Sequence, residues 1–286
     1  MGARGRFCYQ RLRRRREFAS LTGVAADTFD DMVRRLRPVW EREVVAAKTK
    51  DGRPWGVGGL EDHLLVLLIL ARCHLLTQAV LGCLYGVDKS AISRRKGRIE
   101  RIAAKVLGVR RRILVSADEA QALIVDCTEQ PIQRPRRKQR CYYSGKRRRH
   151  TIKAEPVATH HGGRTRIAAV PPPAPGRTHD LTLRRRGPPV PEGCRVYADS
   201  AYQGYEKEHP ATEIPYKRPP GGRLAKDERE YNRALSSFRV RIEHVFARLK
   251  TFRILRDVFR YPRATYHATI RIVAGILNLQ AGFQPR

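Results

Sequence analysis

Three carboxylates in this sequence stand where they can bind metal ions. Asp126 ends the apolar run 122–125, and Asp199 ends a similar run over residues 195–198. Glu243 lies in a helical pattern further along the chain. An acid that ends a buried strand must be solvated, paired or metal-bound, and ligand sets made only of oxygen favour Mg²⁺. We therefore expect these three residues to be catalytic and metal-binding, although each aspartate taken alone also fits a turn or a helix cap.

The net charge of the chain indicates what such a site acts on. Lys and Arg number 59 against 27 Asp and Glu, which gives a formal net charge of +32 and a pI of about 11.0. So large an excess of one sign repels itself in a compact protein, and a polyanion relieves the repulsion. Two Mg²⁺ ions about 4 Å apart activate the attacking oxygen and stabilise the leaving oxygen of a phosphodiester. The combination predicts cutting and joining of nucleic acid.

The remaining composition predicts a cytoplasmic protein with a sizeable core and no membrane partner. Hydrophobic residues make up 41% of the 286 residues. The six cysteines show no Cys-x-x-Cys spacing, which favours reduced thiols over zinc or redox sites. No apolar segment of a signal peptide follows the basic start. The longest apolar run, residues 64–71, is far shorter than the ~20 residues that a membrane span needs.

The first part of the chain predicts a helical domain that binds DNA. Apolar residues at helical spacing cover residues 28–40, 60–75, 77–85 and 89–102. Gly86 supplies the positive φ that ends the third helix, and Asp88 is a good cap for the fourth. The last two helices have the layout of a helix-turn-helix over about residues 76–102. An ordinary helical hairpin with a solvated basic face is the alternative.

This layout sets the expected directions of the side chains. In the first helix of the pair, we expect Val80, Leu81 and Leu84 to pack inward. The second helix would carry the residues that contact DNA. These are Ser90, Ser93, Arg94 and Arg98.

After about residue 110 the pattern changes to strands and then to helices. Runs typical of strands cover residues 122–125, 166–170 and 195–198, and helical patterns cover 227–256 and 266–280. Strands followed by helices over ~170 residues predict a single α/β or α+β domain. The expected domains are therefore residues 1–110 and 111–286.

Two groups of cations accompany the candidate carboxylates. At 100° per residue, Arg239 and Lys250 lie within about 40° of the helix face that carries Glu243, although a surface helix with i,i+4 ion pairs has the same pattern. Residues 130–153 carry many cations and no acid, with Tyr142 and Tyr143 among them. Basic side chains interleaved with aromatics are typical of nucleic-acid contacts. The cations expected to bind DNA in this segment are Lys146, Arg147, Arg148, Arg149 and Lys153.

Five motifs carry a family likeness. They are residues 126–135, 143–153, 176–180, 198–204 and 231–250. In this order they resemble the catalytic domain of bacterial insertion-sequence DDE transposases, in the subgroup related to eukaryotic Harbinger elements. The resemblance implies an α/β (α+β) fold: an RNase H-like catalytic domain with a mixed sheet flanked by helices, preceded by an all-α helix-turn-helix domain.

The same resemblance implies a DNA transposase in which Asp126, Asp199 and Glu243 form the catalytic triad. It implies two Mg²⁺ ions per active site, with Mn²⁺ as a substitute, and it implies that Arg239 and Lys250 hold DNA near Glu243. We expect Asp180 to fix a loop or support a ligand rather than to bind metal. The implied partners are double-stranded DNA, as terminal inverted repeats and as target, and a second copy in a homodimer on DNA. The implied location is the bacterial cytoplasm, in association with the nucleoid.

The sequence departs from the family pattern at three positions. Cys127 stands where the family commonly has Gly, Ala201 also replaces a Gly, and Ser236 stands where related transposases have Tyr. A positive φ at residue 127 would make Cys127 costly, but we expect a negative φ and therefore tolerance. Two alternatives stay open: a metal-dependent endonuclease without strand transfer, and a catalytically dead relic or repressor that still binds DNA.

Overall fold

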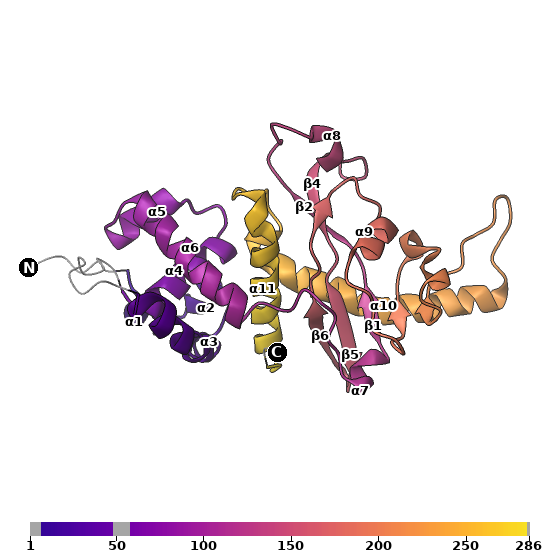
Figure 1. Ribbon diagram of the computed structural model, residues 1–286, viewed down its shortest axis with the longest axis horizontal. Helices are drawn as coiled ribbons and strands as arrows, with labels where there is room; N and C mark the ends of the chain where they lie inside the picture. Colours follow the sequence, from indigo (N-terminus) through magenta and orange to yellow (C-terminus); the bar gives the residue numbers. More distant parts are fainter. Residues whose placement is uncertain (1–6, 48–57, 285–286) are drawn as a thin grey trace, which may run out of the picture. The chain divides into compact units, whose positions relative to one another are not determined.

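The computed structural model describes residues 7–47 and 58–284, which form two compact units (Figure 1). The first unit comprises the described parts of Met1–Gly108, Lys250–Asp257 and Ala268–Pro285. The second comprises Val109–Leu249 and Val258–His267. The expected division at residue 110 differs from this one near the C-terminus, where residues 250–257 and 268–284 group with the N-terminal helices instead of with the second unit.

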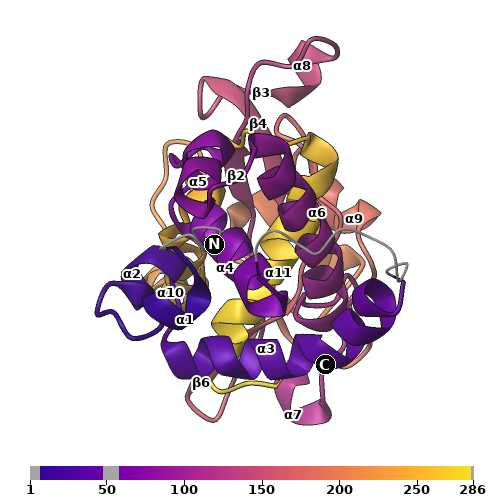
Figure 2. The same cartoon turned by 90° about the vertical axis from the view of Figure 1, so that its left-hand side faces the viewer.

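The first unit is helical and is built around α4 (Figure 2). Helix α4 is buried along most of its length, and α1, α2, α3 and α6 all contact it. In α3, Phe29, Met32 and Leu36 are fully buried, as their helical spacing predicts. The helices of this unit are α1 (Tyr9–Leu12), α2 (Phe18–Thr22), α3 (Ala26–Trp40), η1 (Glu41–Val45), α4 (Leu60–Arg72), α5 (Gln78–Tyr85), α6 (Lys89–Val106), η4 (Arg253–Leu255) and α11 (Tyr266–Gln280).

Helix α11 belongs to this unit because its backbone approaches that of the N-terminal helices. A Cβ atom on Gly275 would lie 1.7 Å from the carbonyl oxygen of Leu107, just after α6. Only glycine therefore fits at this crossing of α11 with the end of α6. The apolar spacing of residues 266–280 predicted the helix itself with its observed bounds.

Helices α5 and α6 are joined by a tight turn. Thr77 caps α5 through its side chain, which accepts a hydrogen bond from the Val80 amide, and Gly86 ends α5 with φ of +65°. Asp88 occupies the N-cap position of α6 without a hydrogen bond from its side chain to the helix. The expected inward packing of Val80 and Leu84 is wrong: they are 46% and 43% exposed. Leu81 is buried as expected, and Tyr85 one turn later is buried with it. In so short a helix, the face packed against α6 decides which side chains are covered.

The second unit holds a mixed sheet of five strands in the order β6-β5-β1-β8-β9. Strand β1 pairs antiparallel with β5 and parallel with β8, and β8 pairs parallel with β9. A mixed sheet with flanking helices is the α/β (α+β) arrangement that the sequence predicts. The strands are β1 (Leu123–Val125), β5 (Val157–His161), β6 (Arg164–Ala169), β8 (Val196–Tyr197) and β9 (Thr212–Glu213).

A second, smaller sheet has the order β2-β4-β3, with β7 paired to β4. Its strands are β2 (Thr128–Pro131), β3 (Tyr143–Ser144), β4 (Arg149–Ala154) and β7 (Ala174–Pro175). The helices of the unit are α7 (Ala117–Ala120), α8 (Gln139–Tyr142), α9 (Asp180–Arg186), η2 (Ser200–Tyr202), η3 (Tyr205–Lys207), η5 (Arg263–Thr265) and most of α10 (Lys226–Thr251).

Helix α10 lies against the main sheet. The ring of Phe238 packs 4.3 Å from that of Tyr197 in β8 and 5.9 Å from that of His160 in β5, measured between centroids. Leu123, Val125 and Val196 belong to a buried apolar core together with Tyr202. Strands β1 and β8 are therefore held in place by this core and by α10. In the described part of the chain, no helix has the length and apolar character needed to cross a membrane.

Candidate active site

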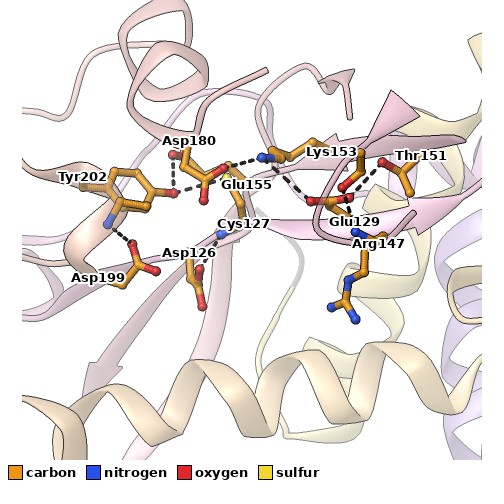
Figure 3. A network of polar contacts seen from close by, with 12 residues as sticks. Asp126, Cys127, Glu129, Arg147, Thr151, Lys153, Glu155, Asp180, Asp199 and Tyr202 are labelled. Carbon is orange, nitrogen blue, oxygen red and sulfur yellow. Dashed lines mark hydrogen bonds and ion pairs between the residues drawn. The ribbon is translucent and has the colours of Figure 1, made fainter. Parts of the chain in front are cut away.

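Two of the three predicted carboxylates leave the main sheet at the same edge. Asp126 directly follows β1, and Asp199 follows β8 after one residue. The two strands are parallel neighbours, with Leu123 opposite Val196, so their carboxyl ends meet. Figure 3 shows both side chains beside each other at this edge. Asp126 and Asp199 therefore lie side by side at the ends of two neighbouring strands.

Local hydrogen bonds fix both side chains. The backbone amide of Cys127 donates to Oδ1 of Asp126 at 2.7 Å. The amide of Ala201 donates to Oδ1 of Asp199 at 2.9 Å, so Asp199 caps the short helix η2. Each aspartate therefore has one oxygen held by its own loop, which limits how the carboxylate can turn.

The environment of Asp126 disfavours its negative charge. Burial, together with the nearby charge of Asp199, raises the pKa of Asp126 to about 6, against the guanidinium of Arg239, which lowers it. Nη2 of Arg239 lies 3.7 Å from Oδ2 of Asp126, and the two side chains are 17% and 20% exposed. Two carboxylates at one edge, compensated by a single cation of α10, form a hard-oxygen donor set that a divalent cation fits.

The third predicted carboxylate is placed differently. Glu243 lies on α10 one helical turn after Arg239 and is exposed. Among the residues that the structure describes, no three His, Cys, Asp or Glu side chains converge as a metal site. Asp126 and Asp199 therefore lie together, and the contact of Arg239 with Asp126 places α10, the helix that carries Glu243, beside them.

Comparison with known proteins identifies the family. Residues 125–278 match the DDE superfamily endonucleases. The chain is 32% identical over 270 residues to a probable transposase for insertion sequence element IS702 of Microchaete diplosiphon, covering 93% of this chain and 94% of that protein. It is 31% identical over 266 residues to a putative transposase for insertion sequence element IS112 of Streptomyces albus G, covering 89% and 91%. No solved structure gives a significant match.

The chain belongs to the DDE superfamily endonucleases. It is an enzyme of the insertion-sequence transposase family, as its motifs predicted. Membership of this superfamily implies dependence on divalent metal ions and binding to DNA. The subgroup relation to Harbinger elements stays a prediction.

Next to the aspartates, the transposase has a buried polar network that the sequence did not predict (Figure 3). The Tyr202 hydroxyl donates to Oε1 of Glu155 at 2.9 Å, and Nη1 of Arg184 donates to Oε2 at 2.6 Å. The Tyr202 hydroxyl also lies 3.3 Å from Sγ of Cys127. Because Tyr202 ends helix η2 and Cys127 follows Asp126, this network ties together the two loops that carry the aspartates.

Glu155 is nearly inaccessible and its charge depends on its partners. The side chains of Arg184 and Glu155 are 0% and 1% exposed. Burial raises the pKa of Glu155 to about 7, while Arg184 and the Tyr202 hydroxyl lower it. The only signal in the sequence was an acid among the apolar residues 154–158, and nothing there identified Arg184 as its partner.

Lys153 corrects one sequence prediction. Its ammonium group lies 2.5 Å from Oδ1 of Asp180 and 3.9 Å from Oε1 of Glu129, and its side chain is only 11% exposed. A buried lysine that is paired with two carboxylates is not available to a DNA phosphate, so we withdraw Lys153 from the DNA-contacting set. Asp180, the first residue of α9, is held by this pair and also raises the pKa of Asp126. Its predicted supporting role is therefore kept as a proposal.

The other cations of this segment form an exposed surface. The turn between β3 and β4 presents Lys146, Arg147 and Arg148, and Arg149 at the start of β4 is also exposed. Arg148 adopts φ of +47°, and the Arg147 amide donates to Oγ of Ser144 at 3.2 Å. In Figure 1 this turn lies beside α8, beyond the ends of β2 and β4. We call these four residues the basic hairpin.

The helix-turn-helix candidates divide by exposure. Ser90, Ser93 and Arg94 are exposed on α6. Arg98 is half-buried, and its Nη1 lies 3.4 Å from Nε2 of His63 in α4. Lys250, near the end of α10, is half-buried and belongs to the first unit, so a role for it beside Glu243 stays a prediction.

Cys127 is tolerated in the motif where glycine is common. Among the described residues other than glycine, only Lys138 and Arg148 have positive φ. The backbone at Cys127 therefore does not need glycine, and the expected negative φ is confirmed. The thiol lies against the Tyr202 hydroxyl and the apolar core.

Proposed function

We propose that this transposase cuts DNA at the terminal inverted repeats of its element and joins the freed 3′-OH ends to target DNA. The observation that carries the proposal is the pair Asp126 and Asp199 at one edge of the sheet. Burial and the charge of Asp199 disfavour the negative charge of Asp126. In this proposal the second unit is an RNase H-like catalytic domain. Activated water and then the 3′-OH are the nucleophiles, so no covalent bond between enzyme and DNA forms.

The proposed metal ligands are Asp126, Asp199 and Glu243, and the proposed metal is Mg²⁺, two ions per site, with Mn²⁺ as a substitute. Bound divalent ions would activate the attacking oxygen and stabilise the leaving oxygen. Arg239 and Glu243 are four residues apart on α10 and share a face. Because Arg239 reaches Asp126, that face is turned toward the aspartates, which supports Glu243 as third ligand. With a divalent ion compensating the carboxylate of Asp126, Arg239 would be able to contact a phosphate.

Recognition of the element ends is proposed for the first unit. Exposed Ser90, Ser93 and Arg94 on α6 would read base edges, with Arg98 beside them and supported by His63. The basic hairpin would hold the phosphate backbone near the catalytic unit. Two ends must be processed in one transposition event, so we further infer a homodimer on DNA, which sedimentation of the protein with and without repeat DNA would test.

One assay distinguishes this function from its alternatives. The full chain is incubated with labelled terminal repeats, target DNA and Mg²⁺. Joined products support the transposase, cleaved products alone indicate an endonuclease without strand transfer, and a bound complex without cleavage indicates a dead relic or repressor. The variants Asp126→Ala, Asp199→Ala and Glu243→Ala should each abolish cleavage while repeat binding persists. Near-normal cleavage by one variant would remove that residue from the triad.

Matched control variants separate the loss of a specific contact from a general effect of substitution on the protein. Glu230→Ala removes another exposed glutamate of α10 and should leave cleavage unchanged. Arg94→Ala should weaken binding to terminal repeats more than binding to random DNA, by about 1–3 kcal/mol for a bidentate base contact. Arg34→Ala, an exposed arginine of α3 that pairs with Asp31, is its control. Equal loss on both DNAs would reduce Arg94 to a phosphate contact.

A further inference from the structure

A basic segment that no motif predicted starts at the edge of the sheet that carries the aspartates. Strand β9 runs parallel to β8, and the Ala198 amide donates to the carbonyl oxygen of Glu213 at 3.0 Å. Asp199 follows Ala198, and the chain leaves the sheet directly after Glu213. We call residues 214–225, which connect β9 to α10, the arm. Figure 1 shows it as a long loop that projects beside the N-terminal end of α10.

Hydrogen bonds give the arm a defined shape. The Asn232 side chain clamps Tyr216: Oδ1 accepts from the Tyr216 amide at 2.8 Å, and Nδ2 donates to the Tyr216 carbonyl at 3.0 Å. At the tip, the Gly222 amide donates to the Pro219 carbonyl at 3.1 Å, with φ of +69° at Gly221. Nε of Arg218 donates to the Gly222 carbonyl at 2.7 Å. The arm is therefore held at its base by α10 and closed at its tip by a turn.

The exposed side chains of the arm have the chemistry of a nucleic-acid contact. Lys217, Arg218 and Arg223 are exposed, and the segment contains no Asp or Glu. Tyr216 is 53% exposed. Its ring packs edge-on against Tyr231 of α10, with centroids 5.2 Å apart and planes at 67°. Cations track phosphates, and an aromatic ring supported on one side offers the other side to an unpaired base.

We propose that the arm binds DNA with unpaired bases next to the aspartates, with Tyr216 stacked on one base and the three cations on the phosphates. This inference rests on the proposed function, because it needs DNA at that edge of the sheet. It goes beyond that function by assigning a third DNA-contacting element, separate from α6 and from the basic hairpin. Unpaired DNA arises wherever a strand end is opened for cutting or joining, and the arm would hold it there.

The test compares two probes on the full chain. One probe is a fully paired terminal repeat, and the other is the same repeat with unpaired bases at the cleavage end. Tyr216→Ala and Tyr216→Leu should lose affinity for the unpaired probe by about 5- to 150-fold, the value of one base–aromatic stack, and should bind the paired probe normally. Tyr216→Phe keeps the ring and should stay within about twofold of the wild type.

The cations have a separate readout. Lys217→Ala and Arg223→Ala should each lower the slope of log K against log salt by about 0.7–0.9 on the unpaired probe. Arg164→Ala is the charge-matched control. It is the first residue of β6, directly after the turn that follows β5, and because β5 is antiparallel to β1 this turn is at the opposite edge of the sheet. Its slope on the unpaired probe should equal that of the wild type.

The outcomes separate the arm from the function on which it rests. If the wild type binds neither probe above background, the proposed function fails. If the wild type binds both and Tyr216→Ala weakens neither, or weakens both equally, the arm proposal is overturned while the function stands. Thermal unfolding of each variant shows that it is folded, and Tyr216→Leu retains the packing against Tyr231 if the alanine variant does not fold.

Discussion

Asp126→Asn should make the metal-free transposase more stable while it removes cleavage. The pKa of Asp126 rises from 3.8 to about 6 in the folded protein, so the folded state binds this proton more tightly than the unfolded chain. Below about pH 4 the carboxyl is largely protonated in both states, so it hardly changes the free energy of unfolding. Between about pH 4 and pH 6 it ionises more readily in the unfolded chain, and the folded state loses stability as the pH rises. At 1.36 kcal/mol per pH unit this difference amounts to about 3 kcal/mol above pH 6. Asparagine has no charge, and its Oδ1 still accepts the Cys127 amide.

Chemical denaturation of the metal-free protein at two pH values measures this effect. At pH 8 the free energy of unfolding of Asp126→Asn should exceed that of the wild type by about 3 kcal/mol, and at pH 4 by less than about 1 kcal/mol. Asp227→Asn, at the exposed start of α10, is the control and should change stability by less than about 0.5 kcal/mol. Added Mg²⁺ or Mn²⁺ should stabilise the wild type more than Asp126→Asn. A variant less stable than the wild type at pH 8, or a gain independent of pH, would refute the reasoning.

Three further predictions concern the residues that support the site and the fold. Tyr202→Phe removes a buried hydroxyl that donates to Glu155, so the free energy of unfolding should fall by about 1.5–3 kcal/mol; additive effects in a double-mutant cycle with Glu155→Gln would contradict the bond. Cys127→Gly should change Mg²⁺-dependent cleavage less than tenfold, since residue 127 lacks positive φ; a large gain in rate would show instead that this copy is impaired. Gly275→Ala places a methyl group against the Leu107 carbonyl, and a loss of about 1–3 kcal/mol in urea denaturation is expected, whereas unchanged stability would dispute the close approach of α11.

The sequence predicted the parts of the fold that local patterns determine. Helix α11 and the two strands that precede Asp126 and Asp199 follow from apolar spacing, because burial of one face or of a short run leaves a periodic signal. Spacing does not report which neighbour covers a short helix. Val80 and Leu84 were therefore expected inside, although α6 covers the adjoining face of α5. The grouping of α11 with the N-terminal helices also depends on a long-range contact, that of Gly275.

The partners of buried charged residues could not be predicted from the sequence for a related reason. Lys153 ends a run of cations and was expected to contact DNA, yet its partners Asp180 and Glu129 lie 27 and 24 residues away along the chain and beside it in the fold. Glu155 and Arg184 are separated by 29 residues and form the most deeply buried ion pair of the network. A charged residue looks the same in a sequence whether it is solvated or paired inside, and only the tertiary structure tells the two apart.

The network explains how a protein of net charge +32 keeps an acidic site. Five carboxylates lie in or next to this edge of the sheet: Asp126, Glu129, Glu155, Asp180 and Asp199. The cations paired with them are Lys153, Arg184 and Arg239. Arg184 and Lys153 compensate the deeper acids, and the weak contact of Arg239 at 3.7 Å leaves Asp126 and Asp199 undercompensated. Buried cations therefore fix the frame of the site, and the charge that remains at its surface is what a divalent ion would neutralise.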